Sequence, residues 1–222
     1  SLFGARTPHA QPHRTLGVQP PQRPATALSA PRGAAAVVAP PPHLSLKAVI
    51  GLSTSVPPVY SCDDALVYAS SSLCAVLDGP GQTLFSRHTD DVTALAASPT
   101  EAVVASGQGF GREPIIYIWS SRGEHPVLRK LPGHHELSVS TLAFDARADV
   151  LVSAGMDKNH SIAAWRWRDG ALLAGGVGLQ GVPGALKAVA FDPHAGANGG
   201  PLSFATCGAK SLKFWALDGG EL

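Results

Sequence analysis

The sequence has few charges, few cysteines and no long apolar run. Charged residues make up 15% of the 222 positions, and no apolar stretch reaches the roughly 18 residues that a membrane-spanning helix needs. The three cysteines, Cys62, Cys74 and Cys207, include no Cys-x-x-Cys pair. Their odd number and wide spacing favour free thiols in a reducing compartment, here expected to be the cytoplasm, over a disulfide framework or a zinc site.

Acidic residues are missing from the beginning of the sequence. Residues 1–62 contain five basic side chains and no acidic one, and nine of the 19 prolines fall within the first 43 positions. A basic, Pro- and Ala-rich segment cannot bury enough apolar surface to order itself, so residues 1–43 are predicted to form a disordered tail. Its composition leaves three roles open: a solvated linker, a segment held near an acidic polymer such as tubulin, and an organelle transit segment.

The sequence also has no segment in which apolar residues recur with the period of a helix between capping residues. It contains instead a repeat of strand-like segments. Trp119, Trp165 and Trp215 each end a segment that alternates apolar and polar residues, and these tryptophans are 46 and 50 residues apart. Alternation with a period of two predicts half-buried strands, and a repeat near this length is typical of WD-repeat β-propeller blades. We therefore predict an all-β fold, a partial WD-repeat β-propeller of about three to four blades.

The predicted propeller occupies residues 87–222, and residues 44–86 hold the first blade strands. The three tryptophan-ended segments are expected to be preceded by one or two strands. A propeller closes with about four to eight four-stranded blades. This chain has fewer strands than a closed propeller requires, so we expect it to be part of a longer protein. We also expect it to be stable only together with the remaining blades, because unpaired blade edges promote aggregation.

The blade segments resemble the echinoderm microtubule-associated protein-like family, with a likeness that covers about residues 44–222. The motifs that carry it are His88-Thr89-Asp90, Ala105–Gln108, Ile118-Trp119, Ser153–Asp157, Trp165–Trp167, Thr206–Lys210 and Phe214–Gly219. Ser106 stands where the family has threonine. Residues 46–52 and 65–70 resemble the hydrophobic motif that precedes the propellers of this family, but residues 52–58 depart from it.

This resemblance implies two propellers in tandem, of which the chain holds the first blades. It implies a non-catalytic scaffold that binds microtubules, or partners already bound to them, through its propeller surfaces. Tubulin or microtubule-associated proteins would be the partners, and the location would be the cytoplasmic cytoskeleton or a cilium. A general WD-repeat adaptor for protein assembly without tubulin binding is the main alternative, and a propeller hydrolase is a third.

Polar residues of the blades look catalytic at first, because His, Ser and Asp recur together as in hydrolases. In WD-repeat blades, however, His, Ser or Thr, and Trp form a buried hydrogen-bonded chain, often completed by an Asp. By this resemblance we interpret ten residues as structural: His88, Ser106, Trp119, His134, His135, Ser153, Asp157, Trp165, Thr206 and Trp215. No catalytic residue is assigned.

No cofactor, metal ion or nucleic acid is expected as a ligand. Residues 176–181 match G-x-G-x-x-G, but Pro183 follows where a phosphate-binding helix would have to begin. The adjacent His134 and His135 do not have the spacing of a helical ligand pair. Residues 63–222 contain 12 basic and 16 acidic side chains, which does not fit nucleic-acid recognition.

Overall fold

The computed structural model describes residues 46, 48–109, 113–131, 133–178, 186–196 and 200–217. The predicted tail, residues 1–43, lies outside them. The described residues form strands joined by turns and loops, and all of them belong to one compact unit. In these ranges, no helix is long and apolar enough to cross a membrane.

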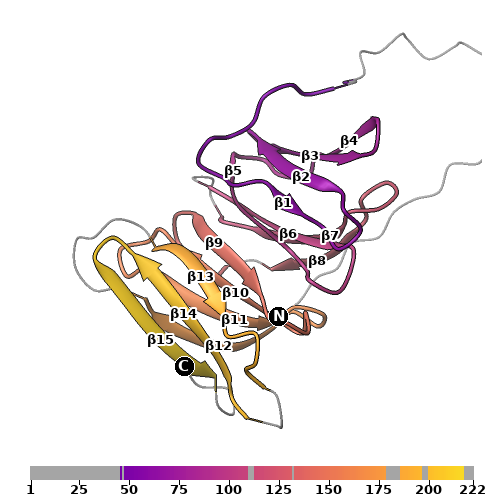
Figure 1. Cartoon of the computed structure of the whole chain (residues 1–222). Coiled ribbons are helices and arrows are strands. Elements are labelled where there is room, and N and C mark those ends of the chain that lie inside the picture. Colours follow the sequence, from indigo (N-terminus) through magenta and orange to yellow (C-terminus); the bar gives the residue numbers. More distant parts are fainter. Residues whose placement is uncertain are drawn as a thin grey trace, which may run out of the picture. The chain divides into compact units, whose positions relative to one another are not determined.

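Four antiparallel sheets follow one another in chain order (Figure 1). Sheet 1 contains β1 (Val59–Tyr60), β2 (Leu66–Ser70), β3 (Leu73–Asp78) and β4 (Gly81–Phe85). Sheet 2 contains β5 (Val92–Ala97), β6 (Val103–Gln108), β7 (Ile116–Ser120) and β8 (Val127–Leu131). Sheet 3 contains β9 (Val139–Phe144), β10 (Val150–Gly155), β11 (Ser161–Arg166) and β12 (Ala171–Val177). Sheet 4 contains β13 (Leu186–Phe191), β14 (Leu202–Gly208) and β15 (Ser211–Leu217).

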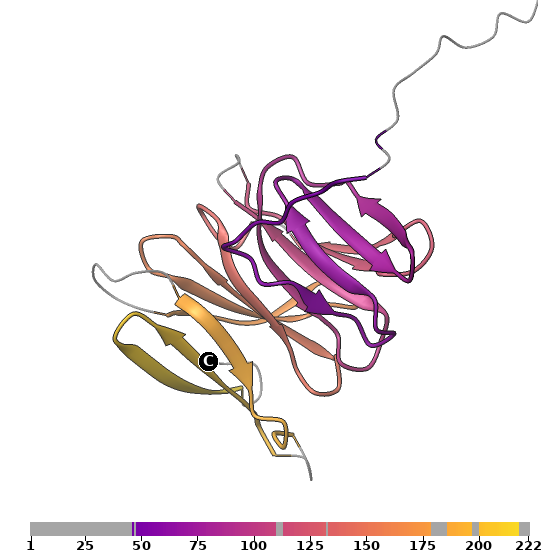
Figure 2. The ribbon, with the colours of Figure 1, turned by 45° about the horizontal axis from the view of Figure 1, so that its top comes forward.

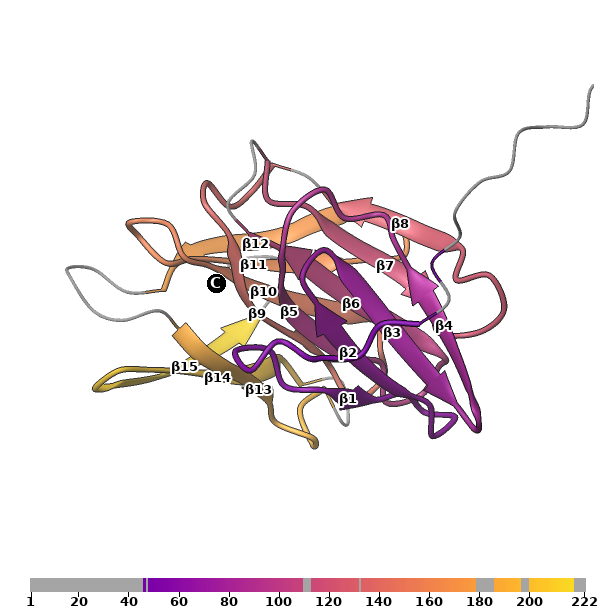
Figure 3. The ribbon, with the colours of Figure 1, turned by 90° about the horizontal axis from the view of Figure 1, so that it is seen from above.

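Each sheet is a meander in which neighbours in sequence pair with each other. Such pairing follows from the short connections, since antiparallel strands need only a tight turn. The first strands of sheets 2, 3 and 4 lie side by side (Figure 3). Thr93 of β5 donates a hydrogen bond to the carbonyl oxygen of Val139 in β9 at 2.7 Å. The prediction of an all-β, partial propeller with three to four blades is confirmed.

The first sheet differs from the sequence prediction in one respect. One or two strands were expected before the tryptophan-ended segments, and the structure has four, which make a complete sheet. The other strands of this sheet were not predicted, because no tryptophan ends its third strand and β1 is only two residues long. The break between sheets 1 and 2 falls between Phe85 and Val92.

The core lies between the sheets, in three apolar layers. Between sheets 1 and 2, Phe85 stacks on Trp119 with ring centroids 4.4 Å apart. Between sheets 2 and 3, Ile118 packs in the same cluster as Trp165. Between sheets 3 and 4, Phe204 and Trp215 pack against the outer face of β10 and β11. Each tryptophan therefore faces the preceding sheet, and each layer is apolar because strand side chains alternate between the two faces.

Candidate functional site

The polar residues of sheet 2 form a chain of hydrogen bonds in its interior. Trp119 donates its indole N–H to the Ser106 hydroxyl at 3.0 Å, and that hydroxyl lies 2.6 Å from Nε2 of His88. His88 Nδ1 lies 3.1 Å from Oε1 of Gln108. An amide oxygen can only accept, so Nδ1 carries the proton and Nε2 accepts the hydroxyl proton of Ser106. Every proton of the chain therefore has an acceptor.

Sheet 3 holds the same chain with an additional carboxylate. Trp165 donates to Ser153 at 2.9 Å, and Ser153 lies 2.8 Å from Nε2 of His135. His135 Nδ1 lies 2.7 Å from the hydroxyl of Ser161, which donates to Asp157. The protons of this chain all point from the indole towards the carboxylate. Ser161 thus separates histidine from aspartate, a link that the sequence analysis missed.

Three other residues that we interpreted as structural lie outside these two chains: His134 in the loop before β9, and Thr206 and Trp215 in sheet 4. His134 lies beside the chain, with Nε2 at 3.2 Å from the carbonyl oxygen of Ile162 and its ring edge-on to Trp165. In sheet 4, Trp215 donates to Thr206 at 2.9 Å. No histidine in the described ranges extends that pair, and residues 179–185, just before β13, lie outside these ranges.

Burial controls the charge of both histidines. It lowers the pKa of His88 to about 4, against a smaller opposing effect of the hydrogen bond to Gln108. It lowers the pKa of His135 to about 4 as well, with a further decrease from His134 and an increase from Asp157. Although His135 Nδ1 lies 4.0 Å from Asp157 Oδ2, the two do not form an ion pair at neutral pH because the imidazole is uncharged.

The arrangement does not present a serine nucleophile to solvent. The side chains of Ser106 and Ser153 are fully buried, and each hydroxyl already accepts an indole N–H and lies beside an imidazole nitrogen. Buried polar groups need such partners, and a satisfied network stiffens the sheet that contains it. In the described residues, no three His, Cys, Asp or Glu side chains form a group that could hold a metal ion.

Gln108 is a further residue that the sequence analysis did not assign. It occupies the end of β6, and its amide N–H groups donate to Glu113 O at 3.2 Å and Thr89 Oγ1 at 3.3 Å. One buried amide therefore joins the loop before β5 to the loop before β7. The Gly-Gln pair was visible in the sequence, but nothing in its spacing indicated that its amide would contact His88.

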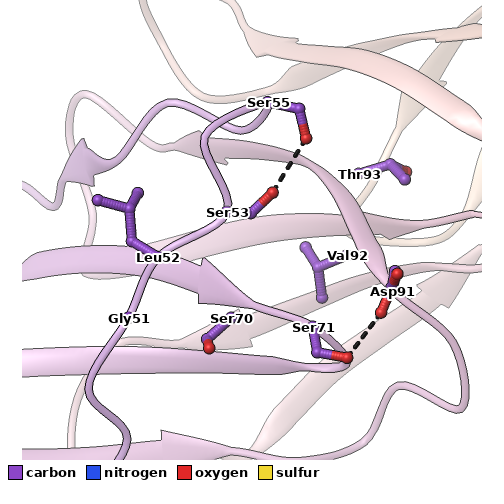
Figure 4. A pocket seen from close by; sticks show the side chains of 9 residues that line it. All are labelled: Gly51, Leu52, Ser53, Ser55, Ser70, Ser71, Asp91, Val92 and Thr93. Carbon is purple, nitrogen blue, oxygen red and sulfur yellow. Dashed lines mark hydrogen bonds between the residues drawn. The ribbon is translucent and has the colours of Figure 1, made fainter.

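A polar pocket of about 500 Å³ lies near these loops, between sheets 1 and 2 (Figure 4). Its polar lining consists of five hydroxyl side chains and one carboxylate: Ser53, Ser55, Ser70, Ser71, Thr93 and Asp91. Gly51, Leu52 and Val92 complete the lining. Ser71 donates to Asp91 at 2.7 Å, and the hydroxyls of Ser53 and Ser55 lie 3.0 Å apart. This lining suits a hydrogen-bonding or cationic group of a partner.

A second candidate surface is basic. It consists of Arg129 and Lys130 on β8, Arg166 at the end of β11 and Arg168 in the turn between β11 and β12, and we call these four residues the basic rim. The two elements touch, because a guanidinium N–H of Arg129 donates to the carbonyl oxygen of Arg168. Figure 3 shows β8 and β12 along the same side of the sheets.

The basic rim carries unpaired positive charge. Arg168 pairs with Glu101, and Arg166 pairs with Asp169 at 2.7 Å. Arg168 also lies 4.4 Å from the ring centroid of Trp167, which holds the guanidinium in place. No carboxylate in the described ranges forms a salt bridge with Arg129 or Lys130. The rim is thus suited to an acidic partner.

Comparison with known proteins gives the family. The model of the WD domain, G-beta repeat, matches residues 80–120 and 126–162. Echinoderm microtubule-associated protein-like 3 of Homo sapiens is 30% identical over 152 residues, which are 63% of this chain and 16% of that protein. WD repeat-containing protein 90 of Homo sapiens is 30% identical over 196 residues, 82% of this chain and 10% of that protein. Cilia- and flagella-associated protein 44 of Chlamydomonas reinhardtii is 29% identical over 151 residues, 65% of this chain and 8% of that protein.

The chain therefore spans less than a fifth of the length of these relatives. The repeat model covers parts of sheets 1, 2 and 3. The relatives include echinoderm microtubule-associated protein-like 2 of Mus musculus, which is 23% identical over 163 residues. The chain is thus a WD-repeat protein related to the echinoderm microtubule-associated protein-like proteins.

Proposed function

We propose that this chain is part of a non-catalytic scaffold that associates with microtubules, in the cytoskeleton of the cell body or of a cilium. The observation that carries the proposal is the relationship to echinoderm microtubule-associated protein-like proteins, together with a cilia- and flagella-associated relative. The buried serine hydroxyls of sheets 2 and 3 favour a structural role of their histidines over catalysis.

The folded part offers a surface of the required charge. Microtubules present an acidic surface, and a positive patch attracts an acidic partner and increases the rate of encounter, most strongly at low salt. The basic rim supplies such a patch on rigid strands, since β8 pairs with β7 along four residue pairs. We therefore assign the microtubule contact to the rim and not to the basic residues 1–43.

Sedimentation with taxol-stabilised microtubules tests this function. The protein and a variant that lacks residues 1–43 would be pelleted at low and at moderate salt. We expect both forms to sediment with microtubules, and less of each at moderate salt, because screening weakens exposed charge contacts. Loss of sedimentation in the truncated form alone would move the contact to the tail. No sedimentation of either form would refute direct microtubule binding.

A general adaptor function is the second candidate, and the polar pocket favours it. Its five hydroxyls and Asp91 provide hydrogen-bond acceptors and a negative charge, which suit a lysine or arginine side chain of a peptide rather than an acidic filament. Asp91→Asn keeps the shape and removes the charge. Under the adaptor hypothesis, this substitution would weaken capture of basic peptides and leave microtubule sedimentation unchanged.

A further inference from the structure

Sheet 2 is covered on both faces but open at its outer edge. The colours in Figure 2 run from sheet 1 at one end of the series to sheet 4 at the other, so sheet 2 has a neighbour on each face. Its fourth strand, β8, pairs with β7 on one side, and no strand in the described ranges pairs with its other side. In the same ranges, residues 127–131 form no backbone hydrogen bond outside the ladder with β7. Such an edge presents N–H and C=O groups to which an extended peptide can add as a further strand.

The edge of β8 differs from the other outer edges in its charge. The fourth strands of sheets 1 and 3, β4 and β12, contain no charged residue, whereas β8 contains Arg129 and Lys130 next to each other. No carboxylate in the described part of the chain forms a salt bridge with either side chain. Val127 and Leu128, which precede them, are 40% and 43% exposed. Opposite charges stabilise a pair of neighbouring strands and like charges destabilise it, so this edge favours a strand that carries carboxylates.

The two basic side chains of β8 lie on opposite faces of sheet 2. Arg129 pairs with Ile118, which belongs to the layer between sheets 2 and 3. Lys130 pairs with Tyr117, which packs against the layer between sheets 1 and 2. The side chains of an added strand alternate in the same way, so two consecutive residues of it lie beside Lys130 and Arg129 in turn. Two adjacent carboxylates therefore each meet a basic side chain, whereas two carboxylates separated by one residue share one face.

We infer that the edge of β8 binds an extended acidic peptide as an additional antiparallel strand, with a Glu-Glu pair beside Lys130 and Arg129. In the antiparallel direction the first glutamate lies beside Lys130 and the second beside Arg129, and the next residue, an apolar one, reaches Leu128. Backbone hydrogen bonds supply affinity and the side chains select the sequence. The inference rests on the proposed function, because it names what the basic rim takes from an acidic partner: an extended glutamate-rich segment.

Two other occupants fit the edge less well. If β8 of a second copy paired with it, the basic side chains of both strands would lie beside each other, and like charges across a strand pair are destabilising. A nucleic acid would neutralise the charges, but it has no peptide groups with which to continue the ladder. The open edge and the two charges of β8 together therefore favour an acidic peptide.

Fluorescence anisotropy with labelled synthetic peptides tests strand addition. The probe is a ten-residue peptide of serine and threonine with Glu-Glu-Val at its centre. We expect a peptide of the same composition, with its two glutamates separated by one residue, to bind about threefold more weakly, because one cross-strand charge pair is lost. N-methylation of one alternate set of backbone nitrogens should weaken binding about tenfold, and methylation of the other set should change it little, since only one set faces β8. Equal binding of all these peptides would show attraction by charge alone and would overturn the inference.

An exchange of charge tests the register. Lys130→Glu should weaken binding of the probe about tenfold, and a peptide with Lys-Glu-Val at its centre should restore it, whereas Glu-Lys-Val should not. This rescue also shows that the variant is folded. Lys158→Glu, a matched change in the exposed loop before β11, is the control and should bind the probe as the unchanged protein does. Failure of the Lys-Glu-Val peptide to restore binding would contradict the inference.

Peptide binding and microtubule sedimentation together separate this inference from the proposed function. Sedimentation of the protein with microtubules without binding of the probe would overturn the inference and leave the function standing. Binding of the probe with the expected preferences, but without sedimentation, would support the inference and refute direct microtubule binding.

Discussion

At the scale of single residues, Ser153 is the hydroxyl on which two other buried groups depend. It accepts the Trp165 indole N–H and donates to His135, so its loss leaves both without a partner. We expect Ser153→Ala to lower the free energy of unfolding by about 2 kcal/mol, since an unsatisfied buried polar group costs about 1–3 kcal/mol. Urea denaturation measures the change. Ser55→Ala, at an exposed position, is the control and should change stability by less than about 0.5 kcal/mol.

The two buried histidines predict how stability depends on pH. Their pKa is about 4 in the folded protein and 6.5 ordinarily, so the unfolded state binds more protons between these values. Above pH 6.5 the two histidines therefore do not lower the free energy of unfolding. As the pH decreases towards 4, the free energy of unfolding falls by roughly 3 kcal/mol for each histidine.

Urea midpoints at pH 7.0, 5.5 and 4.5 would show this decrease. In His88→Gln the decrease should be roughly halved, because one of the two titrating groups is gone. His194→Gln, a matched change at an exposed position outside the two hydrogen-bonded chains, is the control and is expected to keep the full decrease. A midpoint that does not change between pH 7.0 and 4.5 would contradict the assignment of both histidines as buried and neutral.

At this scale, the sequence predicted which side chains to examine but not all of their contacts. His, Ser and Trp recur in the blade segments, and the resemblance to WD-repeat blades implied that they form polar chains. The parts played by Gln108 and Ser161 were not foreseen, because they depend on loop conformations that bring residues together from different turns. The polar pocket was missed for the same reason, since its lining comes from three separate segments.

At the scale of elements, the close approach of β6 and β9 depends on Gly107. A Cβ atom at this position would lie 2.6 Å from Cβ of Val139, closer than side chains approach each other. We expect Gly107→Ala to lower the free energy of unfolding by about 1–3 kcal/mol, the usual cost of overpacking a core. Gly81→Ala is the matched control, because its Cβ would lie 3.7 Å from the carbonyl oxygen of Asp78. Similar thermal midpoints for the two variants would contradict this role of Gly107.

Elements with a tryptophan could be predicted from the sequence, and those without one were less visible. The third strands of sheets 2, 3 and 4 can be recognised in the sequence, because in each an alternating run of apolar and polar residues ends in Trp. Sheet 1 has no such marker, so only one or two of its four strands were expected. Asp78-Gly79-Pro80-Gly81 is a turn signal that could have revealed the hairpin of β3 and β4, since Gly79 adopts a positive φ of 59° there.

At the scale of the whole molecule, rigid sheets carry the proposed contact surface. The sequence predicted the fold class because repeated segments report on architecture. It could not predict the basic rim, whose residues belong to two blades and become neighbours only when β8 packs beside the turn after β11. The charge balance of residues 63–222 gave no sign of the rim, because 16 acidic side chains outnumber 12 basic ones there.

Reversal of the rim charge is the most direct test of the proposed scaffold function. The double variant Lys130→Glu and Arg166→Glu would be sedimented with microtubules beside a control that reverses two exposed charges elsewhere, Lys158→Glu and Lys187→Glu. We expect the rim variant to bind about tenfold more weakly at low salt, because like charges then face each other, and the control to bind nearly as the unchanged protein does. Equal binding of the two variants would contradict the assignment of the microtubule contact to the basic rim.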